Sequence, residues 1–503
     1  MKLSKQNLKK INNAKYVLPS ADMFDLPEKV LQFGTGVLLR GLPNYFIDKA
    51  NRQGIFNGRI VVVKSTSSGS TSAFDEQDNM YTLHVRGIDK GKSLEEDIVC
   101  SAISRVLSAS HEWDEVLKCA HNPDLQIVIS NTTEVGITLM ADYVREGTPV
   151  SFPGKLLAFL YERYKAFGGS EDSGLVIVPT ELIVDNGNKL KEIVMELAMR
   201  NNFKVSFKRW LDQHNTFCNS LVDRIVPGKP DESMMRHLEI ESGYGDDLRI
   251  ISEFYRLWAI QGDTKVAEIL SFSKADEGVI IADDIETYRE LKLRLLNGTH
   301  SLSCGIAHLA GFETVKAAMA DEKMSNYIAD LMIDEIGPSI PYHVEEGGFK
   351  DFAQKVLDRF KNPQLEHLWL SITLSYSAKL KMRVLPVLLL HYDLFKTAPK
   401  NIALGFAAYI RFMQVSRKEN EKYFGESNGK SYELNDAQAA LFHDEFSNLS
   451  ASRLVHAVLK EIRLWDRDLS ELPGFADEII RDLNAINEFG MLEVLKRRST
   501  VNT

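Results

Sequence analysis

The stretch "VLQFGTGVLLRG", Val30 to Gly41, places two glycines one residue apart directly after a short apolar run. The apolar run predicts a buried β-strand, and "NYFIDKAN" (44–51) predicts a helix, with Pro43 tolerated in its first turn. In a dinucleotide-binding unit, one glycine permits the tight turn and the next lets a pyrophosphate approach the backbone at the helix N-terminus. The sequence therefore predicts cofactor contacts from Gly34, Thr35, Gly36 and Val37.

This turn departs from the usual dinucleotide motif in two ways. The place of the third glycine is occupied by Leu39, although Arg40 follows and could pair with a phosphate. The second strand ends in "KST" (64–66) rather than in the carboxylate that commonly holds the ribose of NAD. A plain tight turn and a solvated strand end are the alternatives, and the residues alone leave NAD and NADP open.

Strand-like and helical segments alternate through the first half of the chain. Further strands are expected at "GRIVVVKST" (58–66), "DLQIVISNTT" (124–133) and "GLVIVPTELI" (174–183). From about Asp284 onward the apolar residues recur at helical spacing and β-branched runs are rare. We therefore expect an α/β Rossmann-type domain with a mostly parallel sheet over 1–284 and a mostly α-helical domain over 285–503.

The end of the predicted strand at 124–133 carries "SNTT". In doubly wound sheets, cofactors bind at the carboxyl ends of the strands. We therefore expect Asn131 and Thr133 to approach the nicotinamide side of the cofactor. Simple capping of the strand end is an equally good explanation of these two residues.

A second informative stretch is "YRELKLRLLNGTH", Tyr288 to His300, at the start of the helical half. On an α-helix with about 100° per residue, His300 lies about 80° and Asn297 about 140° from Lys292, so all three share one side. Polar groups on an apolar face need partners, which a hydroxyl-rich substrate would supply. A lysine suits carbonyl reduction, because its ammonium can protonate the alkoxide that hydride transfer creates. Alternatively, the lysine snorkels, Asn-Gly ends the helix and the histidine is a core residue.

The Tyr288–Lys292 pair resembles the Tyr-x-x-x-Lys motif of short-chain dehydrogenases. That motif lies inside the nucleotide-binding domain, whereas this pair opens the helical half. We therefore do not assign a catalytic role to Tyr288.

The spacing Lys-x-x-x-x-Asn-x-x-His is the signature of the mannitol dehydrogenase family of polyol-specific long-chain dehydrogenases, which the chain resembles over nearly its whole length. The signature is matched by Lys292, Asn297 and His300, and the family's Gly-x-Gly-x-x-x-Arg turn by Gly34, Gly36 and Arg40. This resemblance implies a metal-free, NAD-dependent reaction with Lys292 as general acid and base. It also implies substrate contacts from Asp223 in "NSLVDRIVPG" (219–228) and from Lys379, with Arg383 one helical turn further on.

The chain departs from the mannitol-type members of this family at two places. Mannitol-type members carry Asp-Asn where this chain has Glu181 and Leu182, and leucine cannot bind a substrate hydroxyl. The segments "SNTTEVGI", "PTELIVDNG", "FCNSLVDRIVPG" and "FKNP" are similar to members that act on hexuronates. The resemblance thus implies reduction of D-tagaturonate to D-altronate in galacturonate breakdown. Arg289 stands where mannitol-type members have a glutamate, which leaves their proton route in doubt here.

A uronate carboxylate requires a cation besides Lys292, and the candidates are Lys379, Arg383 and Arg224. Sister activities remain open, namely fructuronate reduction or polyol oxidation of the mannitol 2-dehydrogenase type. From another class, the chain could be an NAD-binding sensor without catalysis. The intact Lys-Asn-His set argues against the sensor.

Composition narrows the remaining classes. The net charge is −10 and no long Lys/Arg run occurs, which disfavours nucleic acid as a partner. The strongest apolar run, "VLPVLLL" (384–390), is too short to span a membrane. The four cysteines are scattered without a Cys-x-x-Cys pair, so we expect no metal site and free thiols in a cytoplasmic protein. The sequence does not predict an oligomeric state.

Overall fold

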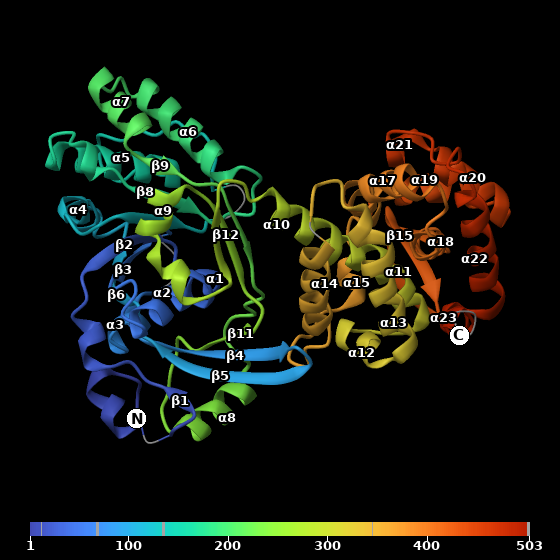
Figure 1. The fold of residues 1–503 in the computed structure, drawn as a ribbon, viewed down its shortest axis with the longest axis horizontal. Helices are drawn as coiled ribbons and strands as arrows, with labels where there is room; N and C mark the ends of the chain where they lie inside the picture. The colour runs from blue at the N-terminus through green and yellow to red at the C-terminus, as the bar shows by residue number, and fades with distance from the viewer. Residues whose placement is uncertain (12, 67–69, 133–135, 345, 500–503) are drawn as a thin grey trace. The chain divides into compact units, whose positions relative to one another are not determined.

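The computed structural model describes residues 1–11, 13–66, 70–132, 136–344 and 346–499 of the 503-residue chain. Its contacts divide the chain into two compact units. The N-terminal unit comprises residues 1–87 and 93–285, and the C-terminal unit comprises residues 88–92 and 286–503. Figure 1 labels many of their helices and strands. In the text, η marks 3₁₀ and π segments.

The N-terminal unit is built on a six-stranded parallel sheet of order β6-β3-β2-β7-β8-β9. Its strands are β2 (Glu28–Phe33), β3 (Arg59–Lys64), β6 (Ile103–Ser108), β7 (Ile127–Ser130), β8 (Val176–Pro179) and β9 (Thr216–Phe217). The expected Rossmann-type α/β fold is thereby confirmed. The strands β7 and β8 end earlier than predicted, because the polar residues after Ser130 and Pro179 belong to loops at the sheet edge.

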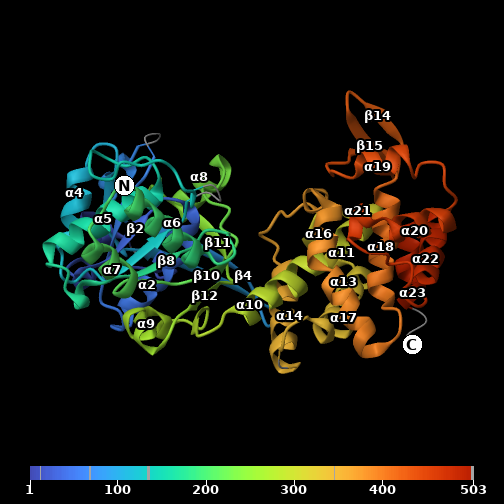
Figure 2. The ribbon, with the colours of Figure 1, turned by 90° about the horizontal axis from the view of Figure 1, so that it is seen from above.

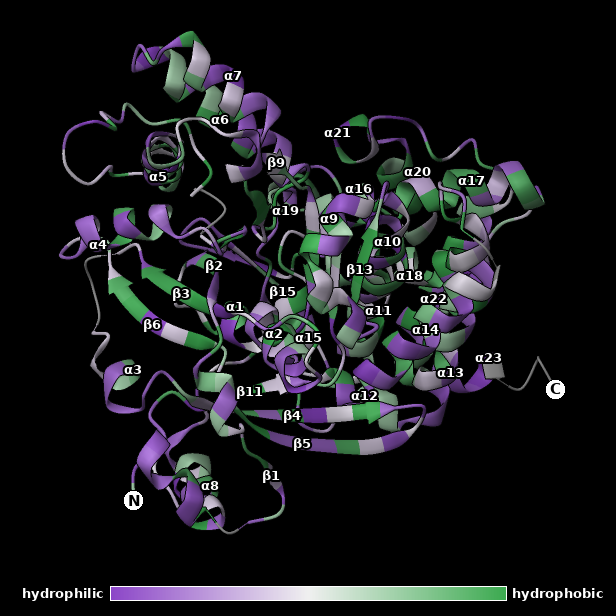
Figure 3. Ribbon diagram, turned by 60° about the vertical axis from the view of Figure 1, so that its left-hand side comes forward, coloured by the Kyte–Doolittle hydropathy of each residue, from purple (hydrophilic) through white to green (hydrophobic). Residues whose placement is uncertain are grey.

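Alternating side chains of these strands serve two separate cores. Val61 and Val63 face one core with α4 (Trp113–Lys118), α5 (Phe152–Ala166), α6 (Asn186–Arg200) and α7 (Val205–Gln213). Ile60 and Val62 face the other core with α2 (Pro43–Arg52). Because successive strand residues point to opposite faces, a fully apolar strand predicts this burial on both sides. In Figure 3, β3 is accordingly mostly green, whereas polar residues interrupt the green of β6.

Two smaller sheets complete this unit and were not predicted. One has the order β1 (Tyr16–Val17), β5 (Lys92–Cys100), β4 (Tyr81–Asp89) and β11 (Ile250–Glu253). The other has the order β10 (Ser220–Asp223), β12 (Leu257–Gln261) and β13 (Val279–Ala282). The remaining short elements are η1 (Lys5–Lys10), η2 (Ala21–Phe24), α1 (Val37–Gly41), α3 (Ser72–Glu76), η3 (Cys119–His121), η4 (Glu171–Ser173), α8 (Glu232–Ser242), α9 (Thr264–Ile269) and η5 (Ser271–Ala275).

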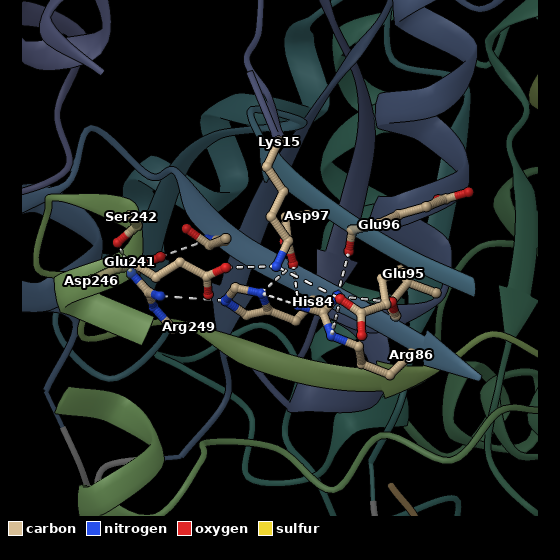
Figure 4. Close-up of polar contacts among 12 residues, drawn as sticks. Lys15, His84, Arg86, Glu95, Glu96, Asp97, Glu241, Ser242, Asp246 and Arg249 are labelled. Carbon is tan, nitrogen blue, oxygen red and sulfur yellow. Dashed lines mark hydrogen bonds and ion pairs between the residues drawn. The ribbon is translucent and has the colours of Figure 1, made fainter. Parts of the chain in front are cut away.

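A polar network joins β4 and β5 of the first small sheet to Arg249, the residue just before β11 (Figure 4). His84 Nδ1 lies 2.5 Å from Asp97 Oδ1, and His84 Nε2 lies 3.4 Å from Arg249 Nη1. Arg86 donates to the same carboxylate at 2.6 Å, and Lys15 Nζ lies 3.2 Å from its other oxygen. Burial lowers the pKa of His84, so the neutral ring donates to Asp97 and accepts from Arg249. Burial alone would raise the pKa of Asp97, but His84 and Arg86 lower it to about 2.

The C-terminal unit is mostly helical, which confirms the second part of the predicted fold. Its elements are α10 (Glu286–Leu291), η6 (Lys292–Gly298), α11 (Thr299–Ala310), α12 (Val315–Ala320), α13 (Glu322–Asp330), η7 (Leu331–Ile336), η8 (Gly337–Ser339), α14 (Glu346–Phe360), α15 (Trp369–Ile372), α16 (Tyr376–Arg383), α17 (Leu385–Phe395), α18 (Lys400–Phe412), β14 (Arg417–Glu419), β15 (Lys422–Ser427), β16 (Lys430–Glu433), α19 (Ala439–Asp444), α20 (Ala451–Lys460), α21 (Ile462–Trp465), α22 (Phe475–Phe489) and α23 (Met491–Ser499). Helix α18 packs against α11 and α22, and Gly405 allows the close approach, because an added Cβ would lie 2.6 Å from Leu302 Cδ2.

A small antiparallel sheet, β14-β15-β16, lies beside α19 in this unit (Figure 2). Among the described residues, no helix is both long and apolar enough to cross a membrane. Within the same residues, no three His, Cys, Asp or Glu side chains are grouped as a metal site would need.

Candidate active site

The glycine turn after β2 has the geometry that a bound dinucleotide would need. Gly34 has φ of +125°, and a Cβ at this residue would lie 2.9 Å from Leu39 Cδ1 and 3.0 Å from Asn131 O. Only glycine accepts this conformation and this closeness. A Cβ at Gly36 would meet no atom within 4 Å, so open space lies in front of the backbone just before Val37, where α1 begins. The turn therefore fits a pyrophosphate group.

Arg40 makes its described contacts inside the N-terminal unit. Its guanidinium donates to Leu248 O and lies 5.3 Å from the centre of the Tyr81 ring. Burial lowers its pKa. In this conformation the arginine braces the segment before β11, and its pairing with a phosphate stays a prediction.

The end of β3 is not the solvated strand end that we considered as an alternative. Lys64 is 7% exposed, and its Nζ donates to Thr66 O at 2.5 Å. The ammonium of Lys64 thus caps the end of β3 through the backbone two residues further on. A buried lysine at the position of the usual carboxylate was not predictable from the strand pattern.

The loops after β7 and β8 are held together by Glu181. Its carboxyl group accepts hydrogen bonds from Thr132 N at 2.8 Å, Thr132 Oγ1 at 3.0 Å and Ser130 Oγ at 3.1 Å. Asn131 Nδ2 donates to Thr180 O at 3.1 Å, which adds a second tie between the two loops. Burial raises the pKa of Glu181. Thr133 lies outside the described residues, so its contact with a cofactor stays a prediction.

Asp223 is buried at the end of β10, and its neighbour Arg224 serves the fold. Arg224 donates to Glu253 O at 2.9 Å and to Gly41 O at 2.5 Å, and its guanidinium lies 4.6 Å from the centre of the Tyr45 ring. Burial lowers its pKa to about 10. These contacts tie the end of α1 to β11 and weaken the case for Arg224 as a substrate cation.

The segment with the lysine, asparagine and histidine differs from the expected α-helix. Residues Lys292–Gly298 form a π-helical segment, η6, and the α-helix α11 begins at Thr299. In a π-turn the residue five positions on takes the place that the residue four positions on has in an α-helix. Asn297 therefore follows Lys292 along one face, and His300 lies a further α-helical turn along the same face. The assumption of 100° per residue is therefore wrong for this segment, and the geometry of a π-turn predicts that the three side chains align more closely.

Arg294 anchors η6 to the helix that carries the candidate substrate cations. It donates to Glu290 at 2.8 Å, to Met382 O at 2.6 Å and to Arg383 O at 3.0 Å. The end of α16 is thereby fixed beside the π-turn. No sequence pattern that we used pointed to Arg294.

His300 is enclosed by aromatic rings. It stacks on Phe360 with 4.3 Å between ring centres, and His367 and Trp369 meet it edge-on at 5.2 and 5.9 Å. Burial and the nearby cationic groups, including Arg359, lower its pKa well below the usual value, so the ring is neutral. Its Nε2 is buried and has no hydrogen-bond partner among the described residues. Such an atom requires a partner from water or substrate.

Lys379 and Arg383 lie one turn apart on α16, as predicted for a cationic pair. Lys379 Nζ donates to Ile372 O at 3.0 Å, and Arg383 Nη1 donates to Ser301 Oγ at 3.1 Å and to Asn297 O at 3.4 Å. Burial and Arg383 lower the pKa of Lys379, and burial lowers the pKa of Arg383. Neither cation forms a salt bridge with a described carboxylate. The Nε of Arg383 is buried without a hydrogen-bond partner in the described part of the chain.

Known families explain this combination of a glycine turn and a Lys-Asn-His helix. Residues 28–274 match the mannitol dehydrogenase Rossmann domain, and residues 284–487 match the mannitol dehydrogenase C-terminal domain. The chain belongs to the mannitol dehydrogenase family. Similar curated members are the altronate oxidoreductases of Halalkalibacterium halodurans and Bacillus subtilis, each 36% identical. The alignments cover 93% of this chain and 93% of the first relative, and 94% and 95% for the second.

Two solved structures of dehydrogenases share the fold. The Pseudomonas fluorescens mannitol 2-dehydrogenase, in a ternary complex with NAD and D-mannitol, aligns with a TM-score of 0.67 and 21% identity over 99% of this chain and 100% of that chain. A substrate-free D-sorbitol dehydrogenase aligns with a TM-score of 0.77 and 21% identity over 98% and 99%. At this identity the likeness concerns the fold. Both alignments span the two matched domains, so this mannitol dehydrogenase family member shares their fold over nearly its whole length.

Proposed function

We propose that the protein is an NAD-dependent oxidoreductase that interconverts D-tagaturonate and D-altronate. The relatives named altronate oxidoreductase support this activity, since they align over nearly the full length of both chains. The observation that carries the substrate class is the cationic pair on α16. Lys379 and Arg383 lie close to His300 and form no salt bridge with a described carboxylate. A substrate carboxylate would therefore pair with these two cations and neutralise part of their positive charge.

In this proposal the N-terminal unit holds NAD and the C-terminal unit supplies the catalytic residues. The open backbone at Gly34 to Val37 fits the pyrophosphate, and Asn131 and Thr133 serve the nicotinamide side. Arg40 contributes to the same site by bracing the unit around the turn. The ammonium of Lys64 donates to Thr66 O and is therefore not directed at a 2′-phosphate, which favours NAD over NADP.

NADH, when bound, supplies the hydride for the substrate carbonyl. The Lys292 ammonium donates a proton to the oxygen that becomes an alkoxide, and takes it back in the oxidation direction. Asn297, aligned by the π-turn, donates a hydrogen bond to the same oxygen. The neutral His300 uses its unpartnered Nε2 to hold a neighbouring hydroxyl. Asp223, Lys379 and Arg383 bind the rest of the sugar acid.

The proposal is tested with purified protein by following NADH absorbance against tagaturonate, fructuronate and fructose. We expect the highest kcat/KM with tagaturonate. Faster oxidation of mannitol than of altronate would overturn the hexuronate assignment, and preference for fructuronate would assign the sister activity.

The replacement Lys292→Ala separates an enzyme from an NAD-binding sensor. We expect turnover to fall about 10²- to 10⁴-fold, because a general acid contributes on this scale, while NADH binding persists. Unchanged turnover would remove Lys292 from the mechanism. The proposal includes a small sugar acid as the partner and a cytoplasmic location, which suits the four buried free cysteines.

A further inference from the structure

The C-terminal unit contains a cavity of about 710 Å³ whose lining shares no residue with the site described above. Its walls come from α13, η7, the start of α18, α22 and α23. The buried part of its lining includes Tyr327, Glu335 and Asp482. Basic side chains at the more exposed part are Lys323, Lys400, Arg481, Arg497 and Arg498.

Asp482 is the unexplained group in this cavity. The residue is 4% exposed, and its Oδ2 has no hydrogen-bond partner among the described residues. The nearest cationic nitrogens, from Arg481 and Arg498, lie 3.6 Å away. These two ion pairs offset part of the cost of burying the carboxylate, but Oδ2 still has no hydrogen bond, so a donor in the cavity would stabilise it further. Its pKa is raised by burial, although the two arginines oppose this shift.

The other buried acid, Glu335, already has its partners. Its two oxygens accept from Asn401 N at 2.7 Å and Ile402 N at 2.8 Å, which caps the N-terminus of α18. The hydroxyl group of Tyr327 donates a hydrogen bond to Asn401 O at 3.1 Å. The requirement for an added donor therefore rests on Asp482.

An added acceptor is required as well. Arg498 donates through Nη2 to Lys400 O at 3.0 Å, but its buried Nη1 has no hydrogen-bond partner in the described part of the chain. A hydroxyl group can donate to Asp482 and accept from Arg498 at once. Among the basic side chains of the lining, Arg481, Arg497 and Lys323 pair with glutamates outside the cavity. Lys400 forms no salt bridge with a described carboxylate, so an anionic group is favoured near Lys400 and Arg498.

We propose that this cavity is a second binding site, for a small hydroxylated carboxylate, with a hydroxyl group on Asp482 and Arg498 and the carboxylate at the basic side chains. The site is independent of the proposed reaction, because it shares no residue with it. The elements that line the cavity also pack against the segment of the proposed active site, since η7 contacts η6 and α18 contacts α11.

Isothermal titration of the full chain with D-gluconate tests this site. We expect two binding events in the wild type, one of which weakens at least tenfold in Asp482→Asn and in Arg498→Gln. The matched control is Asp477→Asn, an exposed carboxylate on the same helix, which should bind as the wild type does. Arg383→Met should weaken only the other event.

Circular dichroism of each variant checks folding. Because Asp482→Asn and Arg498→Gln are independent, the test still holds if one of them does not fold. A single binding event in the wild type that only Arg383→Met removes would overturn the proposal, as would unchanged binding in both cavity variants. Tagaturonate turnover is measured in parallel and should remain close to wild type in Asp482→Asn. If turnover is absent in every protein while the cavity event persists, the proposed reaction fails and the second site stands.

Discussion

The role of Arg383 allows a sharp test, because its surroundings set the size of the effect. The replacement Arg383→Met keeps the length of the side chain and removes its charge. In the structure one nitrogen of the guanidinium serves Ser301 and Asn297, and the buried Nε has no described hydrogen-bond partner. One charge-assisted bond to a substrate carboxylate is worth about 1.5–3 kcal/mol. We therefore expect kcat/KM for tagaturonate to fall about 10- to 150-fold.

The assay compares tagaturonate with fructose, which has no carboxylate, in the variant and in Lys381→Met. Lys381 lies on the same helix and is paired with Asp466 at 2.7 Å, so its replacement removes a cation that already has its partner. We expect the Lys381 variant to keep its kcat/KM within about twofold, since exposed ion pairs contribute little. The reasoning is refuted if Arg383→Met loses less than about threefold on tagaturonate, or loses equally on both sugars.

Three further outcomes follow from the fold. Asp97→Asn breaks the buried pair with His84 and should lower the free energy of unfolding by about 3–5 kcal/mol, whereas Glu95→Gln, half-exposed on the same strand, should change it little; equal melting temperatures would contradict this. Gly34→Ala forces a Cβ into a backbone with φ of +125° and should weaken NADH binding in fluorescence titration, and unaltered affinity would show that the turn does not hold the cofactor. Burial raises the pKa of Glu335 to about 7, so the stability that its protonated form contributes is full below the pKa of the unfolded chain and is lost as the pH rises through about 7. The melting temperature of the wild type should therefore fall more between these two pKa values than that of Glu335→Gln, and parallel melting curves of the two proteins against pH would contradict this prediction.

Much of the architecture was predictable from local pattern. The apolar runs around Val61 and Val128 are buried on both faces, and such runs indicate central strands of a parallel sheet without any knowledge of their neighbours. The glycine pair was predictable in the same way, since positive φ and open backbone are properties of glycine itself. The cationic spacing of Lys379 and Arg383 followed from the resemblance to known members and from helical periodicity.

The partners of buried polar groups were not predictable, because they depend on contacts between residues far apart in the chain. Arg40 and Arg224 read as possible ligand cations, but backbone carbonyls of Leu248 and Gly41 accept their hydrogen bonds. Lys64 is buried against its own strand end for the same reason.

The sequence by itself determined the alternation of strands and helices, the glycine turn and the order of Lys292, Asn297 and His300 along one segment. Only the tertiary structure decided how that segment is wound. A π-turn costs more than an α-turn in isolation, and here the bonds of Arg294 to the end of α16 accompany it. Because those bonds join residues nearly ninety positions apart, local periodicity predicted one shared side for the three polar residues but not the π-turn between Lys292 and Gly298.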